Sequence, residues 1–131
     1  MPSTLSPIDS LSEALATERR LIDELLAVIH RQRTAVAEDD LRGIEDSMFA
    51  THRLLVTLSE AKCRRRTLNT LLGQSEDVGI LALDRVLGAR MTAELRAERD
   101  GLHQAARTLS REVAVNRELL RDAMGDAAKS A

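Results

Sequence analysis

Few side chains in this sequence have the types and spacing that catalysis or metal binding needs. The three histidines, His30, His52 and His103, lie on different segments in polar surroundings. None of them follows a glutamate by three positions, as the Glu-x-x-His motif of di-metal helical bundles requires. Walker-type loops, dinucleotide-binding glycine motifs and Gly-x-Ser-x-Gly are absent from the sequence. We therefore predict no catalytic residue, no metal site and no cofactor, and expect the protein not to be an enzyme.

Cys63 is the one remaining side chain with reactive chemistry. A single cysteine excludes an intramolecular disulfide and a zinc site built from cysteines. Lys62 and Arg64 flank it, but no histidine lies nearby in the sequence to act as its base. A nucleophilic role is not predicted.

The charge balance argues against nucleic acid and membrane partners. The chain has 131 residues, with 19 basic and 21 acidic side chains and a net charge of −2. Its one basic cluster, Arg64–Arg66, would spread over about 200° of a helix and has no aromatic neighbour for base stacking. No apolar stretch reaches the roughly 18 residues of a membrane span, and residues 1–10 do not resemble a secretory signal. We expect a cytoplasmic protein without membrane insertion.

The elements that position these side chains are predicted by heptad spacing. The first helix should follow an N-cap at Asp9 or Ser10, because apolar residues recur every seventh position from there. An acidic turn, Glu38–Asp40, precedes a second helix that should end before Gly73 as its C′ residue. The apolar residues that define the first helix are Ile8, Leu15, Ile22, Ile29 and Val36.

Two further helices follow a predicted loop at residues 74–80. A short one should run from Ile80 to Leu87 and end at Gly88, and a long one should start near Ala89. The fold class is therefore all-α: an elongated antiparallel helical bundle or coiled coil with three long helices and one short helix. We expect a flexible lead at residues 1–9, one helical domain at residues 10–124 and a frayed tail at residues 125–131.

The last helix carries the most informative apolar face. In one interpretation this face completes a three-helix core. In the other, its C-terminal half extends beyond the shorter helices and binds an amphipathic helix of another protein. Asn116 at a seam position would lower stability but fix the register of whatever packs there. The face consists of Leu102, Ala106, Leu109, Val113, Asn116 and Leu120, with Leu119 beside it.

The order of motifs resembles the FlgN-like family of flagellar export chaperones, which escort hook–filament junction proteins to the type III secretion machinery. The matching segments are an acidic turn followed by Leu41, then Leu54-Leu55-x-x-Leu58, then the Arg64–Arg66 run leading into Leu68-Asn69-x-Leu71-Leu72-Gly73, and finally Asn116-Arg117-x-Leu119-Leu120. Together they cover roughly residues 10–122. The most discriminating part is the arginine run with its LN-x-LLG stretch, followed by NR-x-LL.

This resemblance implies a cytoplasmic, non-catalytic chaperone of flagellar type III protein export. The client would be the helical terminal segment of the junction proteins, and the face of the last helix listed above would bind it and keep it soluble. Components of the export apparatus are further partners implied by the family. Some members use a tyrosine near the C-terminal end to engage the export gate, and this sequence has no tyrosine.

The alternative from the residues alone is a structural protein. A coiled-coil homodimer or a secretion-coupling scaffold would satisfy the same apolar stripes by self-association and would have no client groove.

Overall fold

The computed structural model describes residues 6–73 and 79–130, and the side chains of these residues up to 126. The long helices are α1 (Pro7–Ala37), α2 (Leu41–Leu71) and α4 (Ala93–Ser130). The short helix α3 (Leu83–Leu87) is flanked by two 3₁₀ turns, Ile80–Ala82 and Gly88–Arg90, and we call this stretch the 80–90 segment. No strand occurs in the described ranges, which confirms the predicted all-α class with three long helices and one short one.

α1 begins a few residues earlier than predicted. Its N-cap is Ser6, whose hydroxyl accepts a hydrogen bond from the backbone N–H of Asp9 at 3.1 Å. Pro7 occupies the first helical position, where its missing N–H costs nothing. The predicted lead is therefore helical from residue 7 onward, and its first five residues lie outside the described ranges.

α4 begins later than predicted and extends further. The 3₁₀ turn occupies residues 88–90, so the helix starts at Ala93, with the Thr92 hydroxyl accepting a hydrogen bond from the N–H of Leu95 at 3.0 Å. The helix then continues through Gly125 to Ser130, so the predicted tail is helical as far as that residue.

The turns around α2 match the prediction. Asp40 caps the helix by accepting a hydrogen bond from the N–H of Gly43 at 3.0 Å, and Asp39 before it has a φ of 53°. At the other end Gly73 follows the C-cap with a φ of 77°, a conformation that glycine adopts without strain. Most of the predicted 74–80 loop, residues 74–78, lies outside the described ranges.

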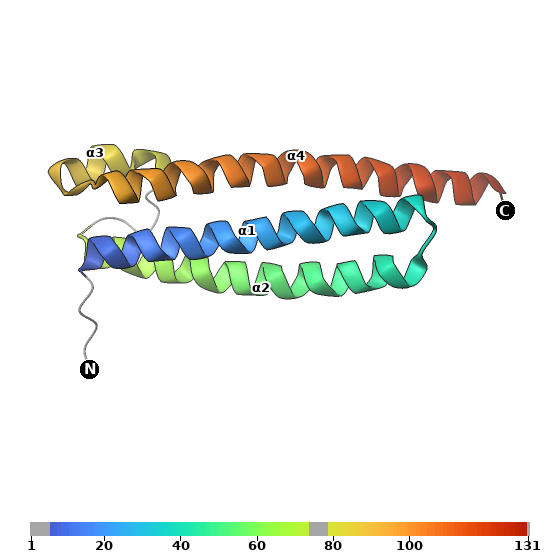
Figure 1. Ribbon diagram of the computed structural model, residues 1–131, viewed down its shortest axis with the longest axis horizontal. Coiled ribbons are helices and arrows are strands. Elements are labelled where there is room, and N and C mark those ends of the chain that lie inside the picture. The colour runs from blue at the N-terminus through green and yellow to red at the C-terminus, as the bar shows by residue number, and fades with distance from the viewer. Residues whose placement is uncertain (1–5, 74–78, 131) are drawn as a thin grey trace.

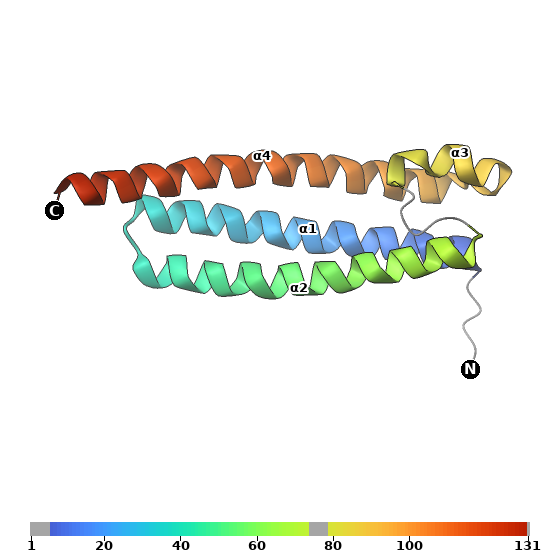
Figure 2. The same cartoon turned by 180° about the vertical axis from the view of Figure 1, so that it is seen from behind.

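α1 is the central helix of an elongated molecule (Figure 1). α2 runs antiparallel to both α1 and α4, and α1 packs along both of them. α2 and α4 barely touch each other. The molecule has two ends: the α3 end, where the 80–90 segment lies beside the start of α4 (Figure 2), and the turn end, where residues 38–40 join α1 to α2.

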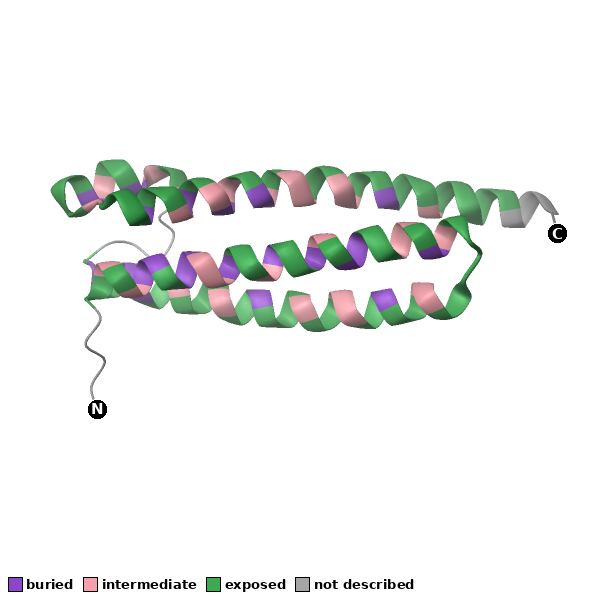
Figure 3. Ribbon diagram, viewed as in Figure 1, coloured by how far each residue is buried: buried purple, intermediate pink, exposed green. Residues whose placement is uncertain are grey.

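The tightest packing lies toward the α3 end. Leu11, Leu15 and Leu95 are fully buried there, and Leu83 and Leu87 of α3 join the same apolar cluster. Toward the turn end α4 becomes mostly exposed, as its colouring shows in Figure 3. The apolar core therefore fills one end of the bundle more completely than the other.

One charged side chain lies inside this core. Glu18 is 1% exposed, and its Oε2 atom lies 3.4 Å from Nε of Arg65 without making a hydrogen bond. Burial raises the pKa of Glu18, and the positive charges of Arg65 and Lys62 oppose that rise without cancelling it. The carboxylate form is therefore disfavoured at this site relative to an unfolded chain.

The uneven core predicts that truncations cost different amounts at the two ends. Leu15→Ala should lower the free energy of unfolding by about 2–5 kcal/mol, because it opens a cavity where the side chain is completely buried. Leu55→Ala at the turn end, where half of the side chain is exposed, should change it by no more than about 1 kcal/mol. Urea denaturation followed by circular dichroism measures both. Equal losses would contradict the uneven core.

Glu18 predicts a pH-dependent stability with a defined sign. The pKa of Glu18 is higher in the folded chain than in the unfolded chain, so folding favours the protonated form. As the pH rises from the ordinary glutamate pKa to this raised pKa, the free energy of unfolding of the wild type should fall relative to that of Glu18→Gln. Below the ordinary range both side chains are neutral, and the difference between the two proteins should stay constant. Melting curves from about pH 3 to about pH 8 test this. A wild-type protein that gains stability over the variant with rising pH would show that the pairing with Arg65 outweighs burial.

A candidate partner-binding groove

A groove opens at the turn end between α2 and α4, with α1 as its floor. Its volume is about 360 Å³, and we call it the α2–α4 groove. All three long helices contribute to its walls: Ile29 and Gln32 from α1, Met48, Thr51, His52 and Leu55 from α2, and Val113, Asn116, Arg117 and Leu120 from α4.

The α2 wall consists of apolar side chains that do not enter the core. Met48 is 60% exposed and Leu55 is 50% exposed. Leu41 precedes Met48 by seven positions, so these three side chains project from one face of the helix. Phe49 and Val56 extend the exposed apolar surface beyond the groove. Exposed apolar side chains grouped in this way are typical of a surface that binds another protein.

The only ionisable side chains that line the groove are basic. Arg117 comes from α4 and His52 from α2, and none of the lining residues carries a carboxylate. Within the described part of the chain, neither Arg117 nor His52 forms an ion pair. The groove therefore combines apolar walls with the positive guanidinium group of Arg117.

A buried polar cluster holds α4 against α1 beside the groove. Asn116 is 4% exposed, and its Nδ2 donates hydrogen bonds to the carbonyl oxygen of Ile29 at 2.8 Å and to Oε1 of Gln32 at 3.2 Å. Nε of Arg33 donates to Oδ1 of Asn116 at 2.9 Å. We call Gln32, Arg33, Glu112 and Asn116 the polar clamp.

Glu112 completes the polar clamp from the solvent side. The Arg33 guanidinium donates a second hydrogen bond to Oε2 of Glu112, and this bond lowers the pKa of the carboxyl. Nε2 of His30 lies 3.7 Å from the same oxygen. The carboxylate is thus kept charged, so the clamp stays ionised as well as hydrogen-bonded.

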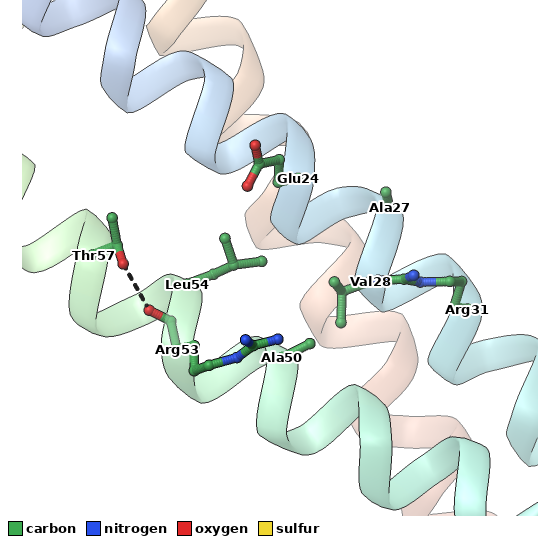
Figure 4. A pocket seen from close by; sticks show the side chains of 8 residues that line it. All are labelled: Glu24, Ala27, Val28, Arg31, Ala50, Arg53, Leu54 and Thr57. Atoms are coloured by element: carbon green, nitrogen blue, oxygen red, sulfur yellow. Dashed lines mark hydrogen bonds between the residues drawn. The ribbon is translucent and has the colours of Figure 1, made fainter.

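A furrow between α1 and α2 is larger than the α2–α4 groove and is lined by more charged side chains (Figure 4). Its volume is about 680 Å³, and no residue of α4 lines it. Glu24, Arg31 and Arg53 are among its lining residues, and the Thr57 hydroxyl donates to the Arg53 carbonyl at 3.0 Å. Charged groups of both signs line it, so it is less suited than the α2–α4 groove to an apolar helix.

The side chains with possible chemistry do not assemble into a site. No group of three histidine, cysteine or acidic residues in the described ranges could hold a metal ion. Cys63 is exposed. The basic cluster diverges as predicted, because Arg65 turns inward to Glu18 while Arg64 and Arg66 stay exposed.

A comparison with protein families identifies a match over nearly the whole chain. The family model described as FlgN protein matches residues 1–130. No curated protein and no solved structure matched this chain. The family model covers nearly every residue and therefore decides the family.

The chain belongs to the FlgN family.

FlgN proteins are flagellar export chaperones for hook-associated proteins, and the family is non-enzymatic. The predicted resemblance and the predicted fold class are thereby confirmed. The family points to the hook-associated proteins as clients of this chain. Among the described helices, none has the length and apolar character needed to cross a bilayer.

This FlgN chain divides the predicted partner face of α4 between the core and the groove. Leu102 is 3% exposed inside the core, and Ala106 and Leu109 pack against it. Further along, Val113, Asn116 and Leu120 line the groove. Leu119 is 36% exposed and does not line it. The first half of the face therefore belongs to the core. Residues of the second half line the groove, where a partner helix could bind them.

The α2 wall was not among the predicted binding residues. Met48 and Leu55 are seven positions apart on α2, and this helical spacing looks the same whether a side chain faces the core or a groove. His52 between them was expected to be an ordinary surface or boundary residue without a catalytic or metal-binding role. The sequence does contain one signal for this wall, which is the width of the apolar surface of α2. Phe49 and Val56 make that surface wider than contact with a single neighbouring helix can bury.

The polar clamp predicts a measurable coupling between α1 and α4. Asn116→Ala should lower the free energy of unfolding by about 1–3 kcal/mol, because it leaves buried polar groups without partners. Combined with Arg33→Ala, the loss should be smaller than the sum of the two single losses, since both changes break the same hydrogen bond. Urea denaturation of the four proteins measures this. Asn116→Ala combined with Thr17→Ala, a pair without a shared contact, should be additive.

Proposed function

We propose that this protein escorts hook–filament junction proteins in the cytoplasm by holding their helical terminal segment in the α2–α4 groove. The single observation that carries this proposal is the groove itself, an apolar furrow bordered by two long helices that barely touch each other. A helix placed there would lie against α2 and α4 and over Ile29 of α1. In this way the client's apolar face would be kept from aggregating before export.

Within the predicted face, Val113, Asn116 and Leu120 are the residues that we propose to contact the client. Leu119, which is partly exposed beside the groove, would contact the edge of the same helix. Leu102, Ala106 and Leu109 would act indirectly, by anchoring α4 to the core so that its second half is held in place. Met48 and Leu55 supply the opposite wall.

The chemistry of the groove suits a client that has to be released. Its apolar walls are aliphatic or thioether side chains, and its lining among the described residues contains no phenylalanine, tyrosine or tryptophan. Aromatic anchors dominate the tightest protein interfaces, so their absence favours a modest affinity. A chaperone that hands its client to a secretion machine requires such reversibility.

A homodimeric scaffold is the alternative, and the exposed apolar side chains of α2 favour it. A second copy could cover Leu41, Phe49 and Val56 and leave no room for a client. Size-exclusion chromatography with light scattering separates the two functions. A dimer at low micromolar concentration that does not bind a junction-protein segment would contradict the chaperone proposal.

Charged substitutions inside the groove should abolish client binding without unfolding the protein. Leu120→Asp combined with Met48→Asp should weaken binding of the terminal segment of a junction protein at least about tenfold, because a carboxylate would replace an apolar contact on each wall. Val115→Asp is the matched control, since Val115 is exposed on α4 and does not line the groove. Fluorescence anisotropy measures affinity, and circular dichroism measures helix content. Equal loss of helix content and binding in the double variant would assign these side chains to the fold instead.

A further inference from the structure

α4 carries the same pattern of side chains twice. An apolar residue is followed three positions later by a polar one, then directly by an arginine, and three positions after that by a leucine. The two copies are 18 residues apart, which is five complete turns of an α-helix, so corresponding side chains leave α4 in the same direction. The first copy is Leu95, Glu98, Arg99 and Leu102, and the second is Val113, Asn116, Arg117 and Leu120.

The first copy is covered by another part of the chain. Leu83 and Leu87 of the 80–90 segment are buried in the same cluster as Leu95 and Leu102. The copies therefore differ in surroundings. Residues 80–90 lie beside the start of α4, whereas α1 lies alongside its second half and the 80–90 segment does not reach it (Figure 2).

Ion pairs of one carboxylate connect the 80–90 segment to α4. Asp84 accepts hydrogen bonds from the Arg99 guanidinium and from Nε of Arg96, the latter at 3.3 Å. The bond from Arg99 lowers the pKa of Asp84, so this carboxylate stays charged. On the other side, Nη1 of Arg90 donates to the carbonyl oxygen of Leu72, at the end of α2, at 3.3 Å. The segment thus connects α4 to α2 with apolar contacts and one ion-paired carboxylate.

The second copy has the same apolar positions and the same arginine but no cover. Val113 and Leu120 line the α2–α4 groove and are only partly buried. Arg117 lies five turns beyond Arg99 and is exposed, and in the described residues it has no ion pair. The groove therefore lacks two things that the 80–90 segment supplies to the first copy: a pair of apolar side chains and a carboxylate.

We propose that the α2–α4 groove takes a helix with the chemistry of the 80–90 segment, in which leucine-type side chains four positions apart enter the groove and an aspartate or glutamate next to them pairs with Arg117. This inference rests on the proposed chaperone function and adds what the client segment must carry. The acidic residue is required because a neutral or basic client would cover the Arg117 guanidinium without pairing it.

A pair of designed peptides tests the charge requirement directly. The first contains two successive copies of residues 81–87, LALDRVL, and the second has lysine in place of both aspartates. Both are labelled, and their binding to the full chain is followed by fluorescence anisotropy. The aspartate peptide should bind at least about tenfold more tightly than the lysine peptide, and Arg117→Glu should reverse that preference.

Two variants control for effects outside the groove. Arg121→Glu changes an exposed arginine one turn further along α4 that does not line the groove, and it should leave the preference unchanged. Leu120→Asp should abolish binding of both peptides. Circular dichroism should show that both Arg117→Glu and Leu120→Asp keep the helix content of the wild type, since both positions are at least partly exposed.

The outcomes separate this inference from the chaperone proposal. A reversed preference supports the inference even where a junction-protein segment fails to bind, and that failure overturns the chaperone proposal alone. Binding of the junction-protein segment with equal affinity to wild type and Arg117→Glu overturns the inference and leaves the chaperone proposal in place. The inference is also overturned if neither peptide binds, or if Leu120→Asp leaves peptide binding intact.

Discussion

The packing of α1 against two helices that barely touch each other is the constraint on which this structure depends. In a symmetrical three-helix bundle each helix covers the other two, and the core is closed along its length. Here α1 is the one long helix that packs along both α2 and α4 in the described ranges, so the space between those two must be filled by something else wherever the core is to be closed. At the α3 end the 80–90 segment fills part of it, with Leu83 and Leu87 buried. At the turn end the space remains as the α2–α4 groove.

The polar clamp explains how α4 keeps its position where apolar packing runs out. Leucine at residue 116 would continue the heptad, but this chain has an asparagine that reaches the Ile29 carbonyl, Gln32 and Arg33. Hydrogen bonds have directions and defined lengths, so they fix register more sharply than aliphatic contacts do. The clamp draws α4 toward α1 and does not draw it toward α2. It therefore holds one wall of the groove firmly while leaving the groove open.

The sequence predicted the elements well, because their signals are local. Heptad spacing located the long helices, and Gly73 and the acidic turn before Leu41 located the ends of α2. The start of α1 was misplaced because Ser6 and Asp9 are both good caps, and only the structure shows which one accepts the hydrogen bond. The binding role of the α4 face stays a prediction. Periodicity identifies an apolar face but does not specify its partner, so the sequence did not indicate that Met48 and Leu55 of α2 line the same groove as Val113 and Leu120.

The separation of α2 from α4 also has a thermodynamic consequence. A helix bound between them would bridge two helices that barely touch each other, and it would cover apolar side chains such as Met48 and Leu55 that are exposed in the free chain. Any ligand that binds only the folded chain raises the free energy of unfolding, and above its Kd this gain grows with the logarithm of the free ligand concentration. Escort and cargo would thus protect each other from unfolding, and withdrawal of the cargo would return the turn end of the carrier to its looser, unoccupied arrangement.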